Sequence, residues 1–148
     1  MPASINVTGL EGGNSSPSAD YKSTQLRHRF DPLVVFPGPV DAIEQVMHRM
    51  RGAEPLLVQV AAWMEDVPTG GDEVSIDLHY SLNGSAFTSL LTTPLVFDAG
   101  SSNNVVQLAS IAVTALAAGG LLKVIVDVTG MTGANLGVQV VVDEKAGP

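Results

Sequence analysis

The sequence predicts an all-β protein, an antiparallel β-sandwich that carries an extended N-terminal arm. Three segments, 74–80, 122–128 and 138–143, place apolar residues at every second position, so each can turn one face to a core and the other to solvent. Asn83-Gly84 and Gly119-Gly120 are turn signals between such segments. Hydrophobic residues make up 45% of the chain but aromatic residues only 5%, which indicates a core of Val, Leu, Ile and Ala.

The first part of the chain differs from the rest. Residues 1–20 are rich in Gly, Ser, Asn and Pro, with little that could build a core. Such a segment is either an unstructured tail or an arm that orders on a partner, and we expect the arm. The predicted organisation is therefore an extended arm over residues 1–32 followed by one sandwich domain over residues 33–148.

The first elements of the domain include one ambiguous segment. Residues 33–36 form a short apolar strand, and Pro37-Gly38-Pro39 is expected to be a turn that cannot continue a ladder. Residues 41–51 fit either a helix, with Asp41 as its N-cap, or an edge strand. The helical spacing i, i+3, i+4, i+7 is occupied by Ile43, Val46, Met47 and Met50.

The later elements alternate with turns at intervals of about ten residues, which is typical of a sandwich or barrel. Residues 105–115 are apolar in more than one register and fit either a helix or a strand. Residues 66–72 and 98–104 are expected to be polar loops. The expected strands are 56–65, 74–82, 87–91, 95–97, 121–129 and 136–143.

The net charge of −8 has an uneven distribution. Residues 1–51 hold five basic and five acidic side chains, whereas residues 52–148 hold only Lys123 and Lys145 against ten acidic ones. An acidic body repels phosphate backbones, so we expect no nucleic-acid partner. The neutral N-terminal part, with its arginines, is the better candidate for contacting an acidic partner surface.

We expect no secretion signal and no membrane span. Residues 1–20 lack the basic start and apolar run of a signal peptide. Residues 99–122 carry no charge, but their Ser, Asn, Gln, Thr and Gly make most membrane-length windows marginal.

Candidate catalytic residues lie on one strand. Ser75, Asp77, His79 and Ser81 alternate with apolar residues, so a solvated strand face explains them better than a hydrolase triad does. No catalytic residue is therefore predicted, and the chain is expected not to be an enzyme. Trp63 is expected to pack in the core or at a subunit contact, because so few aromatic residues make a sugar-stacking platform improbable.

Metals and cofactors are not expected either. The three histidines are far apart in sequence and cysteine is absent, so a zinc site has no support. The acidic loops around Asp72 and Asp98 lack the ligand spacing of an EF-hand, and ordinary turn chemistry explains their composition.

Four segments together carry a resemblance to a known module: Val67–Leu78, Leu82–Phe87, Leu90–Leu95 and Ala117–Gly130. Through them, residues 33–143 resemble a jelly-roll-like β-sandwich module that recurs in virion proteins of tailed bacteriophages, in head decoration proteins, head fibres and tail fibres alike. One departure is Gly119-Gly120, where similar modules often have Gly-Asp. The resemblance also favours a strand at residues 41–51.

The resemblance implies a structural protein on the capsid exterior, made in the host cytoplasm. A small sandwich with a polar arm and no fibre shaft resembles a capsid decoration (cement) protein, whose partner would be the major capsid protein and which would form a dimer or trimer. The alternative is a head- or tail-fibre module that binds a host receptor or surface glycan. Aromatic and arginine side chains dominate interface energetics, so the expected arm anchors are Tyr21, Leu26, Arg27, Arg29 and Phe30.

Overall fold

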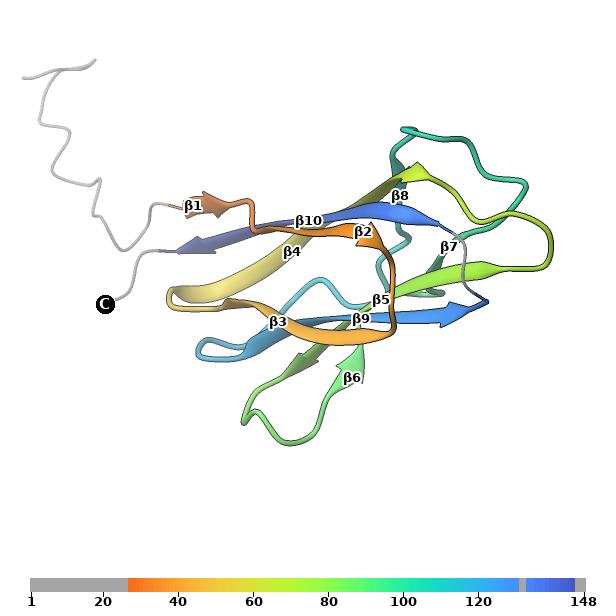
Figure 1. Ribbon diagram of the computed structural model, residues 1–148. Helices are drawn as coiled ribbons and strands as arrows, with labels where there is room; N and C mark the ends of the chain where they lie inside the picture. Colours follow the sequence, from red (N-terminus) through yellow and green to blue (C-terminus); the bar gives the residue numbers. More distant parts are fainter. Residues whose placement is uncertain (1–26, 131–132, 146–148) are drawn as a thin grey trace, which may run out of the picture.

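The computed structural model describes residues 27–130 and 133–145. These residues form two antiparallel five-stranded sheets packed face to face, which confirms the predicted β-sandwich (Figure 1). Sheet A consists of β1 (Arg27–Phe30), β2 (Leu33–Pro39), β4 (Ala53–Asp66), β8 (Gln107–Leu108) and β10 (Ala134–Lys145). Sheet B consists of β3 (Ile43–Arg49), β5 (Glu73–Ser81), β6 (Thr88–Ser89), β7 (Leu95–Phe97) and β9 (Leu121–Thr129).

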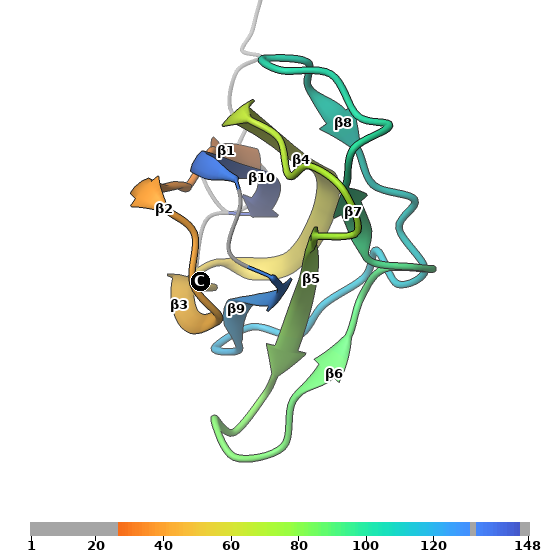
Figure 2. The same cartoon turned by 45° about the vertical axis from the view of Figure 1, so that its right-hand side comes forward.

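The order of the strands is that of a jelly roll. Along the chain, β2, β3, β4 and β5 alternate between the two sheets, and β8, β9 and β10 do the same. As a result β10 lies between β4 and the β1–β2 edge, and β9 lies between β3 and β5. The edge strands β2 and β3 lie on one side of the sandwich, and β8 and β6 lie on the other (Figure 2). The jelly-roll-like form of the predicted fold is therefore confirmed.

The N-terminal boundary of the sandwich lies earlier than the sequence predicts. β10 is longer than β2, which pairs with it only from Ala134 to Gln139. β1 pairs with the remaining part, from Val142 to Lys145. Residues 27–30 therefore belong to sheet A, and the boundary expected after residue 32 falls inside that sheet.

The prediction that Pro37-Gly38-Pro39 ends the ladder is wrong. β2 runs to Pro39, which pairs with Ala134. Proline is tolerated because β2 is an edge strand with a single partner, so its missing N–H breaks no second ladder. A bulge at Asn135, whose φ is 59°, lets the Asn135 Oδ1 accept a hydrogen bond from the Gly38 N–H at 2.6 Å.

The structure assigns both segments, 41–51 and 105–115, for which the sequence allowed a helix or a strand. Residues 43–49 form strand β3, as the resemblance favours, and not the helix that the local spacing suggests. Residues 105–115 form neither a helix nor a long strand. They contain only β8 and two isolated bridges, Leu91↔Ile111 and Leu56↔Ala115, because the segment crosses the open side of the sandwich as a loop.

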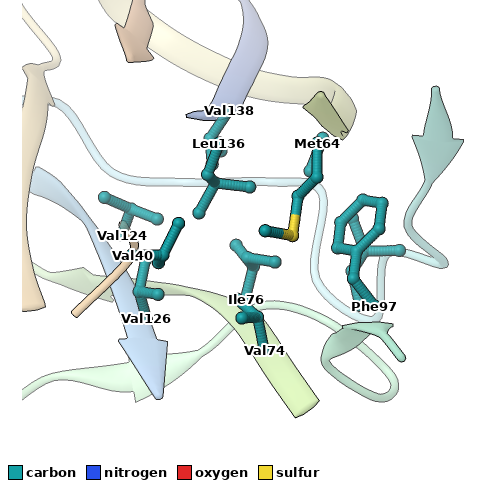
Figure 3. Close-up of a cluster of buried hydrophobic side chains, with 11 residues drawn as sticks. Val40, Met64, Val74, Ile76, Phe97, Val124, Val126, Leu136 and Val138 are labelled. Atoms are coloured by element: carbon teal, nitrogen blue, oxygen red, sulfur yellow. The ribbon is translucent and has the colours of Figure 1, made fainter. Parts of the chain in front are cut away.

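The core lies between the two sheets and is almost entirely aliphatic. Figure 3 shows side chains from both sheets, such as Leu136 and Val138 from β10 and Val124 and Val126 from β9, pointing toward one another. Phe97 is the one aromatic residue among the buried hydrophobic side chains of the described residues. A core of β-branched and leucine side chains is what the low aromatic content predicts.

Candidate interaction surfaces

Three of the five expected arm anchors lie on β1, and the other two, Tyr21 and Leu26, lie outside the described residues. Arg27, Arg29 and Phe30 are all exposed, and among the described strands β1 pairs only with β10. The Phe30 ring lies 5.4 Å from the His48 ring, centroid to centroid. The three residues therefore lie on one edge strand, but their side chains divide between its faces: Arg27 and Arg29 point to the outside of sheet A, and Phe30 points toward His48 of sheet B.

Both arginines also fasten β1 to the sandwich. The Arg29 guanidinium forms two hydrogen bonds with the Asp143 carboxylate, of 3.0 and 3.3 Å. The Arg27 Nη2 donates to the carbonyl oxygens of Glu54 and Asp143, each at 2.8 Å. The hydrogen bond and charge of Arg29 lower the pKa of Asp143 below its ordinary value. The base of the arm is thus a fixed edge strand.

A buried carboxylate joins the two sheets close to β1. Glu144 is only 1% exposed. Its Oε2 lies 2.6 Å from the His48 Nε2, and its Oε1 accepts the backbone N–H groups of Arg51 and Gly52 at 2.8 and 2.6 Å. We call these four residues the Glu144 clip. Because Glu144 is on β10 and His48 on β3, the clip connects sheet A to sheet B at the end where the arm leaves.

The pKa of Glu144 is the sum of opposing effects. Burial raises the pKa, but the hydrogen bonds from His48, Gly52 and Arg51 together outweigh it, so the pKa is lowered from its ordinary value. A carboxyl group whose pKa is lower in the folded state stabilises the fold above its unfolded pKa, and this stabilisation is lost as the pH falls through the folded pKa.

We therefore expect the free energy of unfolding to fall between about pH 5 and pH 3, and to fall less steeply in Glu144→Gln. Urea unfolding of both proteins across this pH range measures the difference. Because the substitution removes only one titrating carboxyl group, parallel curves for the two proteins would contradict a role for Glu144.

The outer face of sheet A is apolar and uncharged over most of its area. We call this surface the neutral face. On β4 and β10, the side chains that form the neutral face are those that alternate with the buried core residues. On β2 and β8, they are the side chains that pair beside these outward positions. Its large apolar members are Leu33, Val35, Val58, Trp63, Leu108 and Val141.

Charged residues lie only at the two ends of this face in the described strands. The Arg29–Asp143 ion pair is at one end, and Glu65, which accepts a hydrogen bond from Asn135, is at the other. The outward strand positions between them hold two polar side chains, Gln59 and Gln139. The neutral face is therefore an uncharged and mostly apolar strip on a chain with a net charge of −8.

Trp63 lies flat on this face because its cross-strand neighbour is a glycine. Trp63 pairs with Gly137, and a Cβ atom at Gly137 would come within 2.2 Å of the indole ring. The tryptophan is only partly buried. The prediction that Trp63 packs in the core is wrong, because Ala62 and Met64 occupy the inward positions of β4. A subunit contact remains a prediction.

The outer face of sheet B is polar and contains the predicted solvated face. The Asp77 carboxylate lies 3.0 Å from the His79 Nε2 and accepts a hydrogen bond of 2.7 Å from the Ser89 hydroxyl. In this group the serine donates to the carboxylate and not to the imidazole, which is not the order that a nucleophilic triad requires. Ser81 is buried and not solvated, since it caps the turn at Gly84.

The acidic loops use their oxygens in turns. The Asp98 Oδ1 accepts the Gly100 N–H at 2.8 Å, and the Asn103 Oδ1 accepts the Val67 N–H at 2.9 Å. Within residues 27–130 and 133–145, no group of three or more His, Cys, Asp or Glu side chains is arranged to hold a metal ion. Over the same residues, no helix is long and apolar enough to cross a membrane.

Comparison with known proteins finds a likeness among solved structures. No protein-family model and no curated protein matches the chain. Among solved structures, the chain is similar to the cyanophage Pam1 capsid asymmetric unit, with a TM-score of 0.48 and 16% sequence identity over 97% of this chain and 99% of that chain.

Proposed function

We propose that the chain is a non-enzymatic structural protein of a tailed-phage virion, a decoration (cement) protein on the capsid exterior. Its partner is the major capsid protein, and the N-terminal arm, with β1 as its base, is the anchor that bridges neighbouring capsid subunits. The protein is made in the host cytoplasm and assembles as a homo-oligomer. The proposal follows the resemblance of residues 33–143 to phage virion modules and the jelly-roll order of the strands.

The observation that carries the proposal is the attachment of β1. An anchor transmits force to the body only if its base is fixed, and two arginines and the β10 ladder fix β1 to sheet A. The next contact along the chain, Phe30 against His48, leads to the Glu144 clip that joins both sheets. Tension on residues before Arg27 is therefore carried into the whole sandwich.

The reach of the arm also suits a bridging role. The 26 residues before β1 can span at most about 90 Å when extended, so the arm can reach well beyond the sandwich. The unpaired edge of β1 can accept a strand from a partner by β-augmentation. Many such contacts across one shell add avidity, so each can be weak.

The test is to delete residues 2–26 and measure binding to heads of the encoding phage that lack this protein. The structure sets the end of the deletion at residue 26, because residues 27–30 complete sheet A. We expect at least a 100-fold loss of head occupancy by cosedimentation, with an unchanged β-type circular dichroism spectrum. A control with residues 2–26 in scrambled order keeps the length and composition of the arm and should also fail to bind.

Full occupancy by the deletion variant would overturn the role of the arm. If the intact chain does not bind heads but binds host-surface glycan, the chain is instead a head- or tail-fibre module. Heads saturated with the intact chain should also resist heating better than bare heads, and equal resistance would refute the cement role.

A further inference from the structure

We propose that the neutral face of sheet A is a self-association surface, on which two copies of this chain pack face to face around a two-fold axis. The inference deepens the proposed function by naming the surface and the symmetry of the homo-oligomer. It depends on contacts within this chain and not on the identity of the capsid partner.

The distribution of charge selects a second copy as the occupant. Two copies that each carry −8 repel one another, so they can approach closely only through a surface that has no net charge. On the outer face of sheet B, the outward strand positions hold Glu44, Asp77, Asp127 and Lys123, which leaves a net negative charge even though Lys123 pairs with Glu44. The neutral face has no charged outward position between its two ends, so it is the face on which this repulsion is smallest.

The chemistry of the neutral face is also that of an interface core. Leu33, Val35 and Leu108 are 51%, 55% and 63% exposed, which is costly for side chains that remain in water. Trp63 adds a flat aromatic surface beside them. A sheet face packed against its own copy forms an isologous contact, and this contact closes after two copies, so the structure favours a dimer over a trimer.

The size of the face sets the strength of the contact. The neutral face is four strands wide, with about 4.8 Å between strands, and about six residues of β10 long. Its area is therefore roughly 300–400 Å² per copy. A standard stable interface buries about 800 Å² per partner. We therefore expect a reversible dimer that dissociates in the micromolar range and that repeated binding across a shell would reinforce.

The remaining interaction surface stays free in such a dimer. The outward side chains of sheet A point away from sheet B, whereas β1 has its open edge in the plane of sheet A. Packing of two neutral faces therefore leaves the outer face of sheet B and the edge of β1 accessible. One dimer can thus present two arms to the capsid at once, which doubles the number of subunits that it bridges.

The test compares two matched valines on opposite faces. Val35→Lys places a charge on the neutral face, and Val46→Lys places the same charge on the outer face of sheet B, at edge-strand positions that are 55% and 50% exposed. Both variants make the net charge less negative by one unit, so general repulsion weakens equally in both. We expect the intact chain and Val46→Lys to dimerise between about 1 and 300 µM in sedimentation velocity, and Val35→Lys to dimerise at least tenfold more weakly.

The only tryptophan of the chain provides a second measurement on the same samples. Trp63 emission should shift to the red when the intact chain and Val46→Lys are diluted, and it should be constant in Val35→Lys. An intact chain that stays monomeric at 300 µM would overturn the proposal, as would equal weakening by both substitutions. A monomer whose Trp63 emission shifts only on addition of a glycan would also overturn it, in favour of a sugar platform. Because these measurements use the chain alone, their outcome is separate from that of the capsid-binding test.

Discussion

Replacing Glu144 by alanine is expected to lower the free energy of unfolding by about 3–5 kcal/mol at pH 7. The substitution leaves the N–H groups of Arg51 and Gly52 and the imidazole of His48 without their buried acceptor. It also releases the link between β10 and β3 at the base of the arm. Because domains of this size are stable by only about 5–15 kcal/mol, the loss is a large part of the total. Urea unfolding followed by circular dichroism measures it.

Two further variants separate the clip from a general effect of lost charge. Glu144→Gln keeps one oxygen acceptor of nearly the same shape, so it should lose clearly less stability than Glu144→Ala. Asp127→Ala removes an exposed carboxylate from β9 and should leave the stability unchanged within measurement error. A loss for Asp127→Ala as large as that for Glu144→Ala would show that the clip contributes nothing specific.

The surroundings of the clip explain why its geometry tolerates no larger residue at Gly52. A Cβ atom at this position would lie 2.1 Å from the Lys145 carbonyl oxygen and 2.9 Å from the Glu144 Cβ. The glycine therefore allows the turn between β3 and β4 to approach β10 closely enough for its N–H groups to reach the carboxylate. Sequence cannot reveal this arrangement, because His48 and Glu144 are separated by 96 residues.

The bounds of a strand could be predicted from the sequence where one of its faces is buried and the other faces solvent. β5 and β9 alternate strictly, and the ranges expected from that alternation agree with the structure to within a residue at each end. The segment at 41–51 could not be assigned from its spacing because β3 contains a bulge between Val46 and His48. A bulge shifts the phase of the alternation, and the shifted apolar residues then imitate the period of a helix.

The interaction surface was harder to predict than the fold. β4 and β10 are apolar on both faces, and a continuous apolar run indicates only that a strand is buried or that its outer face has a partner. The apolar runs at 56–64 and 138–142 therefore indicate that both faces of these strands are apolar. They do not indicate that one of these faces lies on the outside of sheet A. The location of this face depends on which strands flank β4 and β10 in the sheet, here β1, β2 and β8.

Replacing Phe97 by alanine is expected to lower the free energy of unfolding by about 3–5 kcal/mol. Phe97 is fully buried, and in Figure 3 its ring lies beside Met64 at the end of the core formed by β5 and β7. Met64 can fill part of the volume of the missing ring, but the other core side chains are held by their strands and cannot collapse into it. The strand that carries Phe97 has three residues, Leu95–Phe97, and pairs only with β5. Its attachment therefore depends on this side chain more than on its ladder.

The control for this prediction is a second phenylalanine with the same chemistry in a different environment. Phe87 is half-buried on the outside of sheet B, with the Lys123 Nζ 4.0 Å from its ring centroid. Phe87→Ala removes the same atoms without opening a cavity, so its loss of stability should be less than half that of Phe97→Ala. Phe97→Leu fills most of the cavity and should recover most of the loss. Equal losses for the two alanine variants in urea unfolding would mean that the core does not depend on its single aromatic residue.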